Sequence, residues 1–252
     1  MISADSLVSF RRWARFGALL AAVVVIVGAW VRLTNAGLGC PDWPGCYGHV
    51  HPAQVVEQVD SANAAYAARP FDYQKALHEM VHRYIATTLG VVVLGLAVYA
   101  WRHRRNPRQP LRLPLILPLI IAGQGALGAF TVTLLLTPVI VTSHLLGGLT
   151  TLSILWWLSL TPEMRSASAA ERSVRPLALL AFAALMVQLF LGGWTSTNYA
   201  AVSCPDFPTC QGGYHPITDY ANAFRFTHEA GRDYEGGVLP QARSEEHTSE
   251  LQ

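Results

Sequence analysis

Long apolar runs alternate with polar segments along most of the chain. Five runs stand out, each of about 18–22 residues. They are roughly Phe16–Leu33, Tyr84–Trp101 (with a polar lead-in from Lys75), Leu113–Thr133, Val139–Leu160 and Leu177–Thr195. At 1.5 Å per residue, a helix of this length crosses a hydrocarbon core about 30 Å thick. Backbone polar groups must be paired inside hydrocarbon, so the pattern predicts an all-α integral membrane protein.

The composition agrees with this class. Hydrophobic residues make up 52% of the 252 residues and charged residues only 13%, whereas soluble domains average about 25% charged residues. The first run is long and no A-x-A site follows it, so we expect a retained helix and not a cleaved signal peptide. We expect contact with membrane lipid and no nucleic-acid partner.

The positive charges predict the orientation. Eleven arginines lie before the first run, between the second and third runs, and between the fourth and fifth. They are Arg11, Arg12, Arg15, Arg102, Arg104, Arg105, Arg108, Arg112, Arg165, Arg172 and Arg175. The longer, opposite loops carry only Arg69, Lys75, Arg225 and Arg232. Since Lys and Arg are enriched in cytoplasmic loops, we expect the N-terminus in the cytoplasm and the long loops outside.

Two similar stretches, CPDWPGC at 40–46 and CPDFPTC at 204–210, contain all four cysteines. The similarity extends over 25 positions, with GAWVRLTNAGLGCPDWPGCYGHVHP lying over GGWTSTNYAAVSCPDFPTCQGGYHP and eleven positions identical. Each copy begins at the outer end of a predicted helix, and both helices run in the same direction. The pattern therefore predicts a parallel duplication of a four-helix bundle.

The duplication divides the chain into segments. We expect a cytoplasmic N-terminus at 1–15, a first half at 16–160 with an outer loop at 34–75, a cytoplasmic linker at 161–176 and a partial second half at 177–242. Two complete halves require eight helices, and five are predicted. The final RSEEHTSELQ, 243–252, resembles a translated sequencing adapter, with a genuine short polar terminus as the alternative. We leave this tail out of the fold and expect the native sequence to be lost near residue 242.

Ionisable side chains interrupt two of the predicted spans. KALHEMVHRYIA, 75–86, begins a helix that Asp72 can cap, and VTSHLLGGLT places His144 about five residues into another helix. Ionisable groups in a spanning helix face a bundle interior or a water-filled cavity. Both helices enter from outside, so His82 and His144 are expected at similar depth, roughly 10 Å from the outer boundary.

Two histidines facing each other across a bundle suit a haem iron, which takes axial imidazoles. Gly147 and Gly148 are expected to leave room beside His144 for a bulky partner. Zinc fits less well, because no third or fourth ligand is well placed. A hydrogen-bonded interior histidine is the structural alternative for each of the two.

Two charged residues near these histidines have both a structural and a functional interpretation. Glu79 shares a helix face with His82. It either pairs with Arg83 or His78, or acts beside the iron as a proton acceptor or charge stabiliser. Arg32, at the outer end of the first run, either snorkels to the interface or pairs with a substrate carboxylate.

A further polar pattern recurs in the third and fifth runs. QGALGAFTVT and QLFLGGWTST share the form Q-x-x-L-G-x-x-T-x-T. Its small and polar residues favour helix packing and bonding between helices, with a pocket-lining role for Gln124, Thr131 and Thr133 as the alternative. The outer segment 53–68 either rests on the membrane surface or covers the first bundle.

The motifs GAWVRLTNAGLGCPDWPGC, E-x-x-H-R at 79–83 and VTSHLLGGL resemble the haem A synthase family (the CtaA/Cox15 type) up to about residue 242. The resemblance implies two four-helix halves, one holding the substrate haem O and the other a haem b cofactor. It implies oxidation of a haem O methyl group, through an alcohol, to a formyl group, which supplies haem A to terminal oxidases. It also implies a bacterial inner membrane protein with periplasmic cysteine loops.

Carried over by position, the resemblance implies roles for single residues. His82 and His144 correspond to the axial iron ligands of the first half, and Glu79 to the functional glutamate. The cysteines correspond to the disulfide pairs Cys40–Cys46 and Cys204–Cys210, of which only part of the family has the second. Apart from the resemblance, the residues that we expect around the haem are Arg83, Arg32, Gln124 and Thr131. The axial histidines of the second half belong on helices that the chain does not contain, so we expect this chain to be inactive as it stands.

Two other functions remain as alternatives. A di-histidine cytochrome b would hold a haem permanently for electron transfer. A quinone-linked disulfide-exchange protein also has outward cysteine pairs, but its redox pairs are often C-x-x-C, whereas here they are C-x5-C with two prolines inside. The expected partners are haem O synthase and oxidase assembly factors, with a homo-oligomer as a further expectation.

Overall fold

The computed structural model describes residues 2–160 and 169–200, together with 206, 208–210, 212–214, 224 and 226. Five long helices account for most of the described chain. They are α1 (Ile2–Leu33), α3 (Tyr73–Arg102), α4 (Arg112–Thr133), α5 (Pro138–Leu160) and α6 (Ala169–Thr197). Each is long and apolar enough to cross a membrane. The five predicted spans and the all-α membrane class are therefore confirmed.

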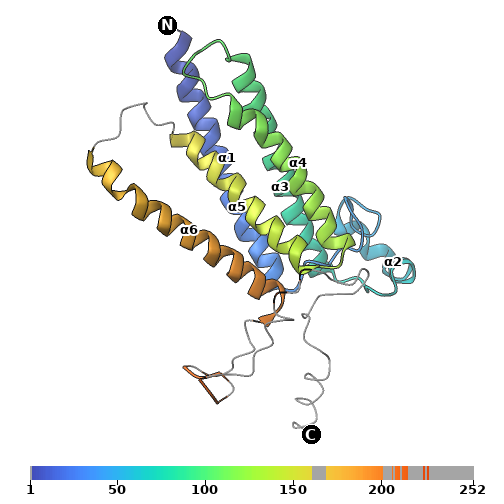
Figure 1. Cartoon of the computed structure of the whole chain (residues 1–252). Coiled ribbons are helices and arrows are strands. Elements are labelled where there is room, and N and C mark those ends of the chain that lie inside the picture. The colour runs from blue at the N-terminus through green and yellow to red at the C-terminus, as the bar shows by residue number, and fades with distance from the viewer. Residues whose placement is uncertain are drawn as a thin grey trace.

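Four of these helices form a bundle (Figure 1). α1 packs against α3 and α5, and α4 packs against the same two helices, so α3 and α5 occupy opposite corners. α6 lies outside the four and packs against α5. The Asp72 side chain accepts hydrogen bonds from the amides of Gln74 and Lys75, which confirms the predicted cap at the start of α3.

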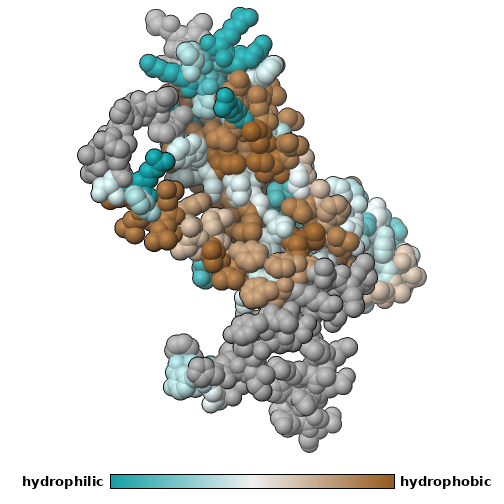
Figure 2. All heavy atoms as spheres, viewed as in Figure 1, coloured by the Kyte–Doolittle hydropathy of each residue, from teal (hydrophilic) through white to brown (hydrophobic). Residues whose placement is uncertain are grey.

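Small residues on α1 allow close packing inside the bundle. Ala14, Ala18 and Ala21 follow Phe10 at helical spacing, and all four are buried against residues of α3, α4 and α5. The outward faces are apolar instead of polar, as Figure 2 shows for one face. Ile26 is 68% exposed and Leu119 75% exposed. This distribution is the one expected when the surrounding solvent is lipid.

Residues 34–72 fold into a cap on the N-terminal end of α3. The segment contains the short helices η1 (Pro52–Gln54), η2 (Val56–Gln58) and α2 (Val59–Ala65). Cys40, Cys46, Tyr47 and Val55 form a buried cluster with Ala76 and Met80 of α3. Val55 thus covers the cysteine segment and does not face lipid, which supports the covering interpretation for this part of segment 53–68.

Aromatic rings hold this cap together. The Tyr47 ring meets Tyr66 and Phe71 edge to face, at centroid distances of 5.4 and 5.2 Å. The Tyr47 hydroxyl donates to the Arg69 carbonyl oxygen at 3.0 Å. Burial raises the pKa of Tyr47, so its hydroxyl keeps the proton for this bond at neutral pH.

The predicted repeat extends to local backbone geometry. In the first copy, Cys46 and His49 exchange backbone hydrogen bonds, and the Asp42 carboxylate accepts from the amide of Gly48. In the second copy, Cys210 and Gly213 exchange the same pair of bonds, and Asp206 accepts from Gly212. Gly48 and Gly212 both have φ of +77°, a conformation that glycine adopts without strain. The identical residues of the two motifs therefore build the same turn.

Candidate functional site

His82 and His144 project into the bundle from α3 and α5, the helices at its opposite corners. Each ring is largely buried, and the Nδ1 atom of each is buried without a hydrogen-bond partner in the described part of the chain. Buried polar atoms are normally paired. Haem iron takes imidazole ligands, so two such rings in one bundle interior fit the axial ligands of a haem.

Gly28 of α1 makes room for the His82 ring. A Cβ atom at this position would lie 2.9 Å from His82 Cε1, closer than side chains pack. A Cβ atom at Gly128 of α4 would lie 3.5 Å from His144 Cε1, which is an ordinary packing distance. Gly28 was not among the predicted site residues. The repeat did carry a signal, because Gly28 and Gly192 are identical positions in the two copies.

The space beside Gly147 differs from the prediction. The Gln124 amide of α4 packs directly onto Gly147, where a Cβ atom would clash with Nε2. A Cβ atom at Gly148 would lie 4.0 Å from Cγ2 of Val25 in α1. These glycines thus bring α4 and α1 close to α5, and the Gln124 side chain takes the place expected for a bulky partner.

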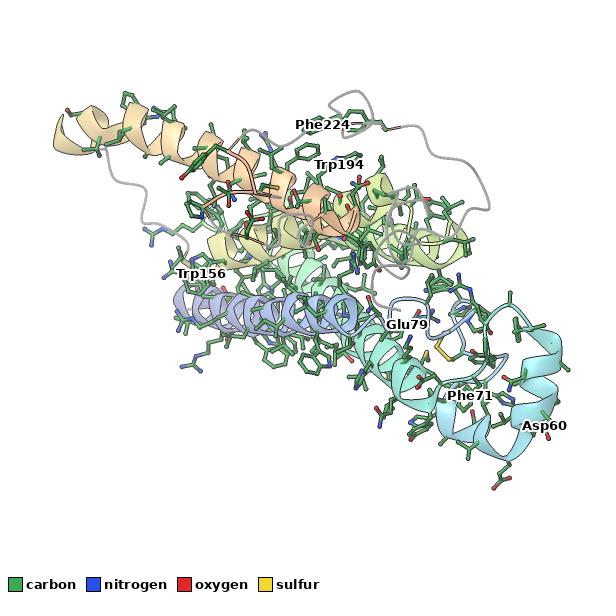
Figure 3. All side chains as sticks on the ribbon, turned by 90° about the horizontal axis from the view of Figure 1, so that it is seen from below. Asp60, Phe71, Glu79, Trp156, Trp194 and Phe224 are labelled. Carbon is green, nitrogen blue, oxygen red and sulfur yellow. A yellow bond between two sulfur atoms is a disulfide. The ribbon has the colours of Figure 1, made fainter. Side chains whose placement is uncertain are left out.

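Glu79 is buried, with 5% of its surface exposed, and both carboxylate oxygens are bonded. Oε2 accepts from the Cys40 amide at 2.8 Å, and Oε1 pairs with Arg83 Nη2. His78 instead meets the Trp30 ring, at 6.2 Å between centroids. Of the two partners considered for Glu79, Arg83 is therefore the one that the structure shows. Figure 3 shows Glu79 close to the yellow disulfide.

Arg83 binds the loop formed by residues 40–46, which we call the cysteine loop. Its Nη1 atom donates to the carbonyl oxygens of Asp42 at 3.0 Å and Pro44 at 3.2 Å, and also to that of Gly45. We call these contacts, together with those of Glu79, the loop latch. Because His82 lies between Glu79 and Arg83 in the sequence, the latch ties the cysteine loop to the helical turn that carries this histidine.

The latch satisfies a charge pair that would be costly alone. A buried carboxylate or guanidinium needs a partner of opposite charge and hydrogen bonds for its remaining polar atoms. Arg83 neutralises Glu79, and the cysteine loop supplies the amide and carbonyl groups that complete both sets of bonds. The loop is therefore part of the polar site and not a separate appendage.

The structure contains the disulfide between Cys40 and Cys46, as the family resemblance implied. Cys210 is also disulfide-bonded, and Cys204 lies outside the described residues. Cys40 is fully buried against α3, where its amide meets Glu79. Asp42 completes the loop by accepting from the Tyr47 amide at 2.6 Å.

Arg32 has a different partner from those expected. Its Nη2 atom donates to the Ser196 carbonyl oxygen at 2.6 Å, and its guanidinium lies 3.8 Å from the centre of the Tyr199 ring. Ser196 is 164 positions further along the chain and is the repeat equivalent of Arg32. Arg32 therefore joins the C-terminal ends of α1 and α6.

The repeated threonine pattern has structural roles in the described residues. Thr131 and Thr133 donate to carbonyl oxygens within α4, at 2.7 and 3.2 Å. Thr197 of α6 forms a buried hydrogen bond with Thr142 of α5, with 3.2 Å between the hydroxyl oxygens. The packing interpretation is thus confirmed for Thr197, whereas the pocket-lining role of Gln124 and Thr131 stays a prediction.

The fold and site together define a multi-pass α-helical membrane protein with two inward-facing histidines. A family model described as cytochrome oxidase assembly protein (COX15-CtaA) matches residues 11–232, and the chain belongs to this family.

Several curated proteins are similar along most of this chain. The haem A synthase of Shewanella oneidensis is 42% identical over 220 residues, which cover 86% of this chain and 66% of the relative. The haem A synthase of Halalkalibacterium halodurans is 28% identical over 224 residues, covering 84% and 69%. That of Novosphingobium aromaticivorans is 28% identical over 244 residues, covering 84% and 68%. The chain thus spans about two thirds of their length, and no solved structure matches it significantly.

Proposed function

We propose that the protein is a haem A synthase, which oxidises a methyl group of haem O to a formyl group through the alcohol. The observation that carries the proposal is the placement of His82 and His144 on the helices at opposite corners of the bundle, with the Nδ1 atom of each ring buried and without a hydrogen-bond partner among the described residues. The name of the curated relatives, haem A synthase, supports the product.

In this proposal haem O is the substrate, and His82 and His144 hold its iron from opposite faces. Gly28 fixes the space in which the His82 ring can stand. A methyl C–H bond is oxidised only by a redox centre, which a haem b cofactor supplies when bound. We assign none of the described residues to this second haem.

Glu79 acts as a charge stabiliser in this scheme. The first step removes two electrons and two protons and takes the hydroxyl oxygen from water, and the second removes two electrons and two protons from the alcohol. Positive charge develops at the reacting edge as the electrons leave. A carboxylate one helical turn before His82 favours that charge, and the loop latch holds it in one position. Both oxygens of Glu79 already accept bonds, which favours stabilisation of charge over direct proton transfer by this residue.

The decisive experiment is extraction of haem from cells that express the full-length gene and are supplied with haem O, because the chain without its second half is expected to be inactive. Haem A in the extract, identified by its mass, is the expected result. A single non-exchanging haem b without modified haem would instead indicate the electron-transfer cytochrome. Turnover of thiols without any haem requirement would indicate disulfide exchange.

Glu79→Gln is expected to lower haem A formation by roughly 100-fold or more, within the range attributed to single electrostatic groups. Glutamine keeps the size and one acceptor oxygen, so the cap retains part of its contacts. Glu57→Gln is the matched control, because Glu57 is an exposed carboxylate of η2 in the same cap. Unchanged haem A formation in Glu79→Gln would remove Glu79 from the mechanism.

Gly28→Ala is expected to reduce haem retention several-fold. The added Cβ atom meets the His82 ring at 2.9 Å, so the ring must turn or shift. Gly95→Ala is the control, because a Cβ atom there has nothing within 4 Å and the helix propensity changes equally. The ratio of haem absorbance to protein after purification measures the effect. Equal ratios in the two variants would show that Gly28 does not position the ligand.

We further propose that the protein lies in a bacterial inner membrane with a cytoplasmic N-terminus and periplasmic cysteine loops. The arginine distribution supports this orientation. The family description supports a connection with cytochrome oxidase assembly. Haem O synthase and oxidase assembly factors as partners, and a homo-oligomer, are further proposals.

A further inference from the structure

A groove lies on the lipid-facing side of the bundle, between α3 and α4 and at the opposite end of α3 from Glu79. Its volume is about 340 Å³. Leu94, Val98 and Trp101 of α3 form one wall, and Leu115 and Pro118 of α4 form the other. Leu94 is 56% exposed and Val98 44% exposed, so the groove opens sideways toward the hydrocarbon. An apolar chain fits these walls.

Arginines surround the mouth of this groove. Arg102 lines it directly. The guanidinium of Arg104 lies 4.4 Å from the centre of the Trp101 ring and donates to the Trp101 carbonyl oxygen at 2.9 Å. Trp101 is itself a wall residue, so Arg104 is held at the same mouth. α4 begins here at Arg112 without a side-chain cap, which adds the positive end of a helix dipole.

This positive end has no nearby carboxylate in the sequence. Five arginines lie between positions 102 and 112, and no Asp or Glu occurs between Glu79 and Glu163. None of these arginines forms an ion pair within the part of the chain that the structure describes. Figure 1 places the turn between α3 and α4 beside the start of α1, and Figure 2 shows hydrophilic side chains gathered there above an apolar surface. An anion at the mouth would therefore meet the positive charges of Arg102 and Arg104.

We propose that this groove binds one anionic phospholipid of the surrounding membrane. An acyl chain lies along the apolar walls, and the phosphate lies against Arg102 and Arg104. Basic pockets between spanning helices recognise anionic headgroups in this way. A zwitterionic lipid fits less well, because its ammonium group would stand beside the arginines. The groove is at the other end of α3 from His82, so the proposal does not depend on the proposed function.

The test measures lipid retention by native mass spectrometry after purification from vesicles that contain equal amounts of phosphatidylglycerol and phosphatidylcholine. We expect retained phosphatidylglycerol in the parent protein. Arg102→Gln/Arg104→Gln is expected to lose it by about tenfold or more, at roughly 1 kcal/mol per arginine. Arg105→Gln/Arg108→Gln removes the same charge from exposed positions that do not line the groove and is expected to retain the lipid.

A variant that fills the groove distinguishes specific lipid binding in the groove from non-specific attraction of anionic lipid to the arginines. Val98→Trp keeps every arginine and occupies the space of the acyl chain, so it is expected to lose phosphatidylglycerol as well. Equal loss in the two arginine pairs, or full retention by Val98→Trp, would overturn the proposal. Displacement of the lipid by excess inorganic phosphate would show a site for free phosphate and would also overturn it. Thermal unfolding in the same vesicles confirms that each variant is folded.

Discussion

His82→Ala and His144→Ala are each expected to abolish stable haem binding. In the proposed site each ring supplies one axial ligand, and alanine removes it while leaving an apolar interior intact. Loss of a residue that only supports a metal ligand typically lowers metal affinity by about 10–100-fold. Loss of the ligand itself should lower the affinity further. The purified variants should therefore lose their haem absorbance, and cells that express them should contain no haem A.

His103→Ala provides the matched control for this pair. His103 lies at the far end of α3, where its ring stacks on Tyr99 at 4.2 Å between centroids. Its replacement removes an imidazole from the same helix without touching the proposed site. Haem binding that survives in both His82→Ala and His144→Ala would show that other residues hold the iron, and the proposed site would then be wrong.

Arg83→Gln is expected to have the largest effect on stability. It leaves Glu79 as a buried carboxylate without its charge partner and removes the donor for three carbonyl groups of the cysteine loop. Removing one member of a buried ion pair typically costs about 3–5 kcal/mol. The cap on α3 should loosen, so thermal unfolding in detergent should begin at a lower temperature and the Cys40–Cys46 disulfide should be reduced faster.

Two further variants make this result specific. Arg83→Lys keeps the charge but lacks the planar guanidinium group that contacts Glu79 and the loop together. We therefore expect an unfolding temperature between those of the parent protein and Arg83→Gln. Arg108→Gln removes an exposed arginine outside the latch and should unfold like the parent protein. If Arg83→Gln matched Arg108→Gln in both measurements, the latch would contribute nothing to the stability of the cap.

The latch also changes how the cysteine motif is interpreted. CPDWPGC alone is compatible with a redox pair or a structural closure. In the structure the loop supplies an amide to Glu79 and three carbonyl groups to Arg83, beside the turn that carries His82. A structural contribution of the disulfide to the site follows from these contacts, and a redox role stays a separate prediction.

Local chemistry made several features predictable from the sequence. The helices follow from apolar runs long enough to cross a bilayer, and the start of α3 follows from Asp72, whose cap contacts lie two and three residues away. The two copies of the CPD motif build the same turn because Asp42 and Asp206 each reach an amide six residues further on. The inward placement of His82 and His144 follows from the cost of exposing ionisable groups to lipid.

Only the tertiary structure decided which distant groups meet. Glu79 had two candidate partners, Arg83 and His78, and the contacts of Glu79 and Arg83 with the cysteine loop depend on how residues 34–72 fold over α3. Arg32 meets Ser196 and Tyr199 because α6 packs beside α5, which its own sequence does not specify. Helix formation is local and depends on each segment alone, whereas a polar side chain pairs with whichever group the packed chain brings within about 3 Å.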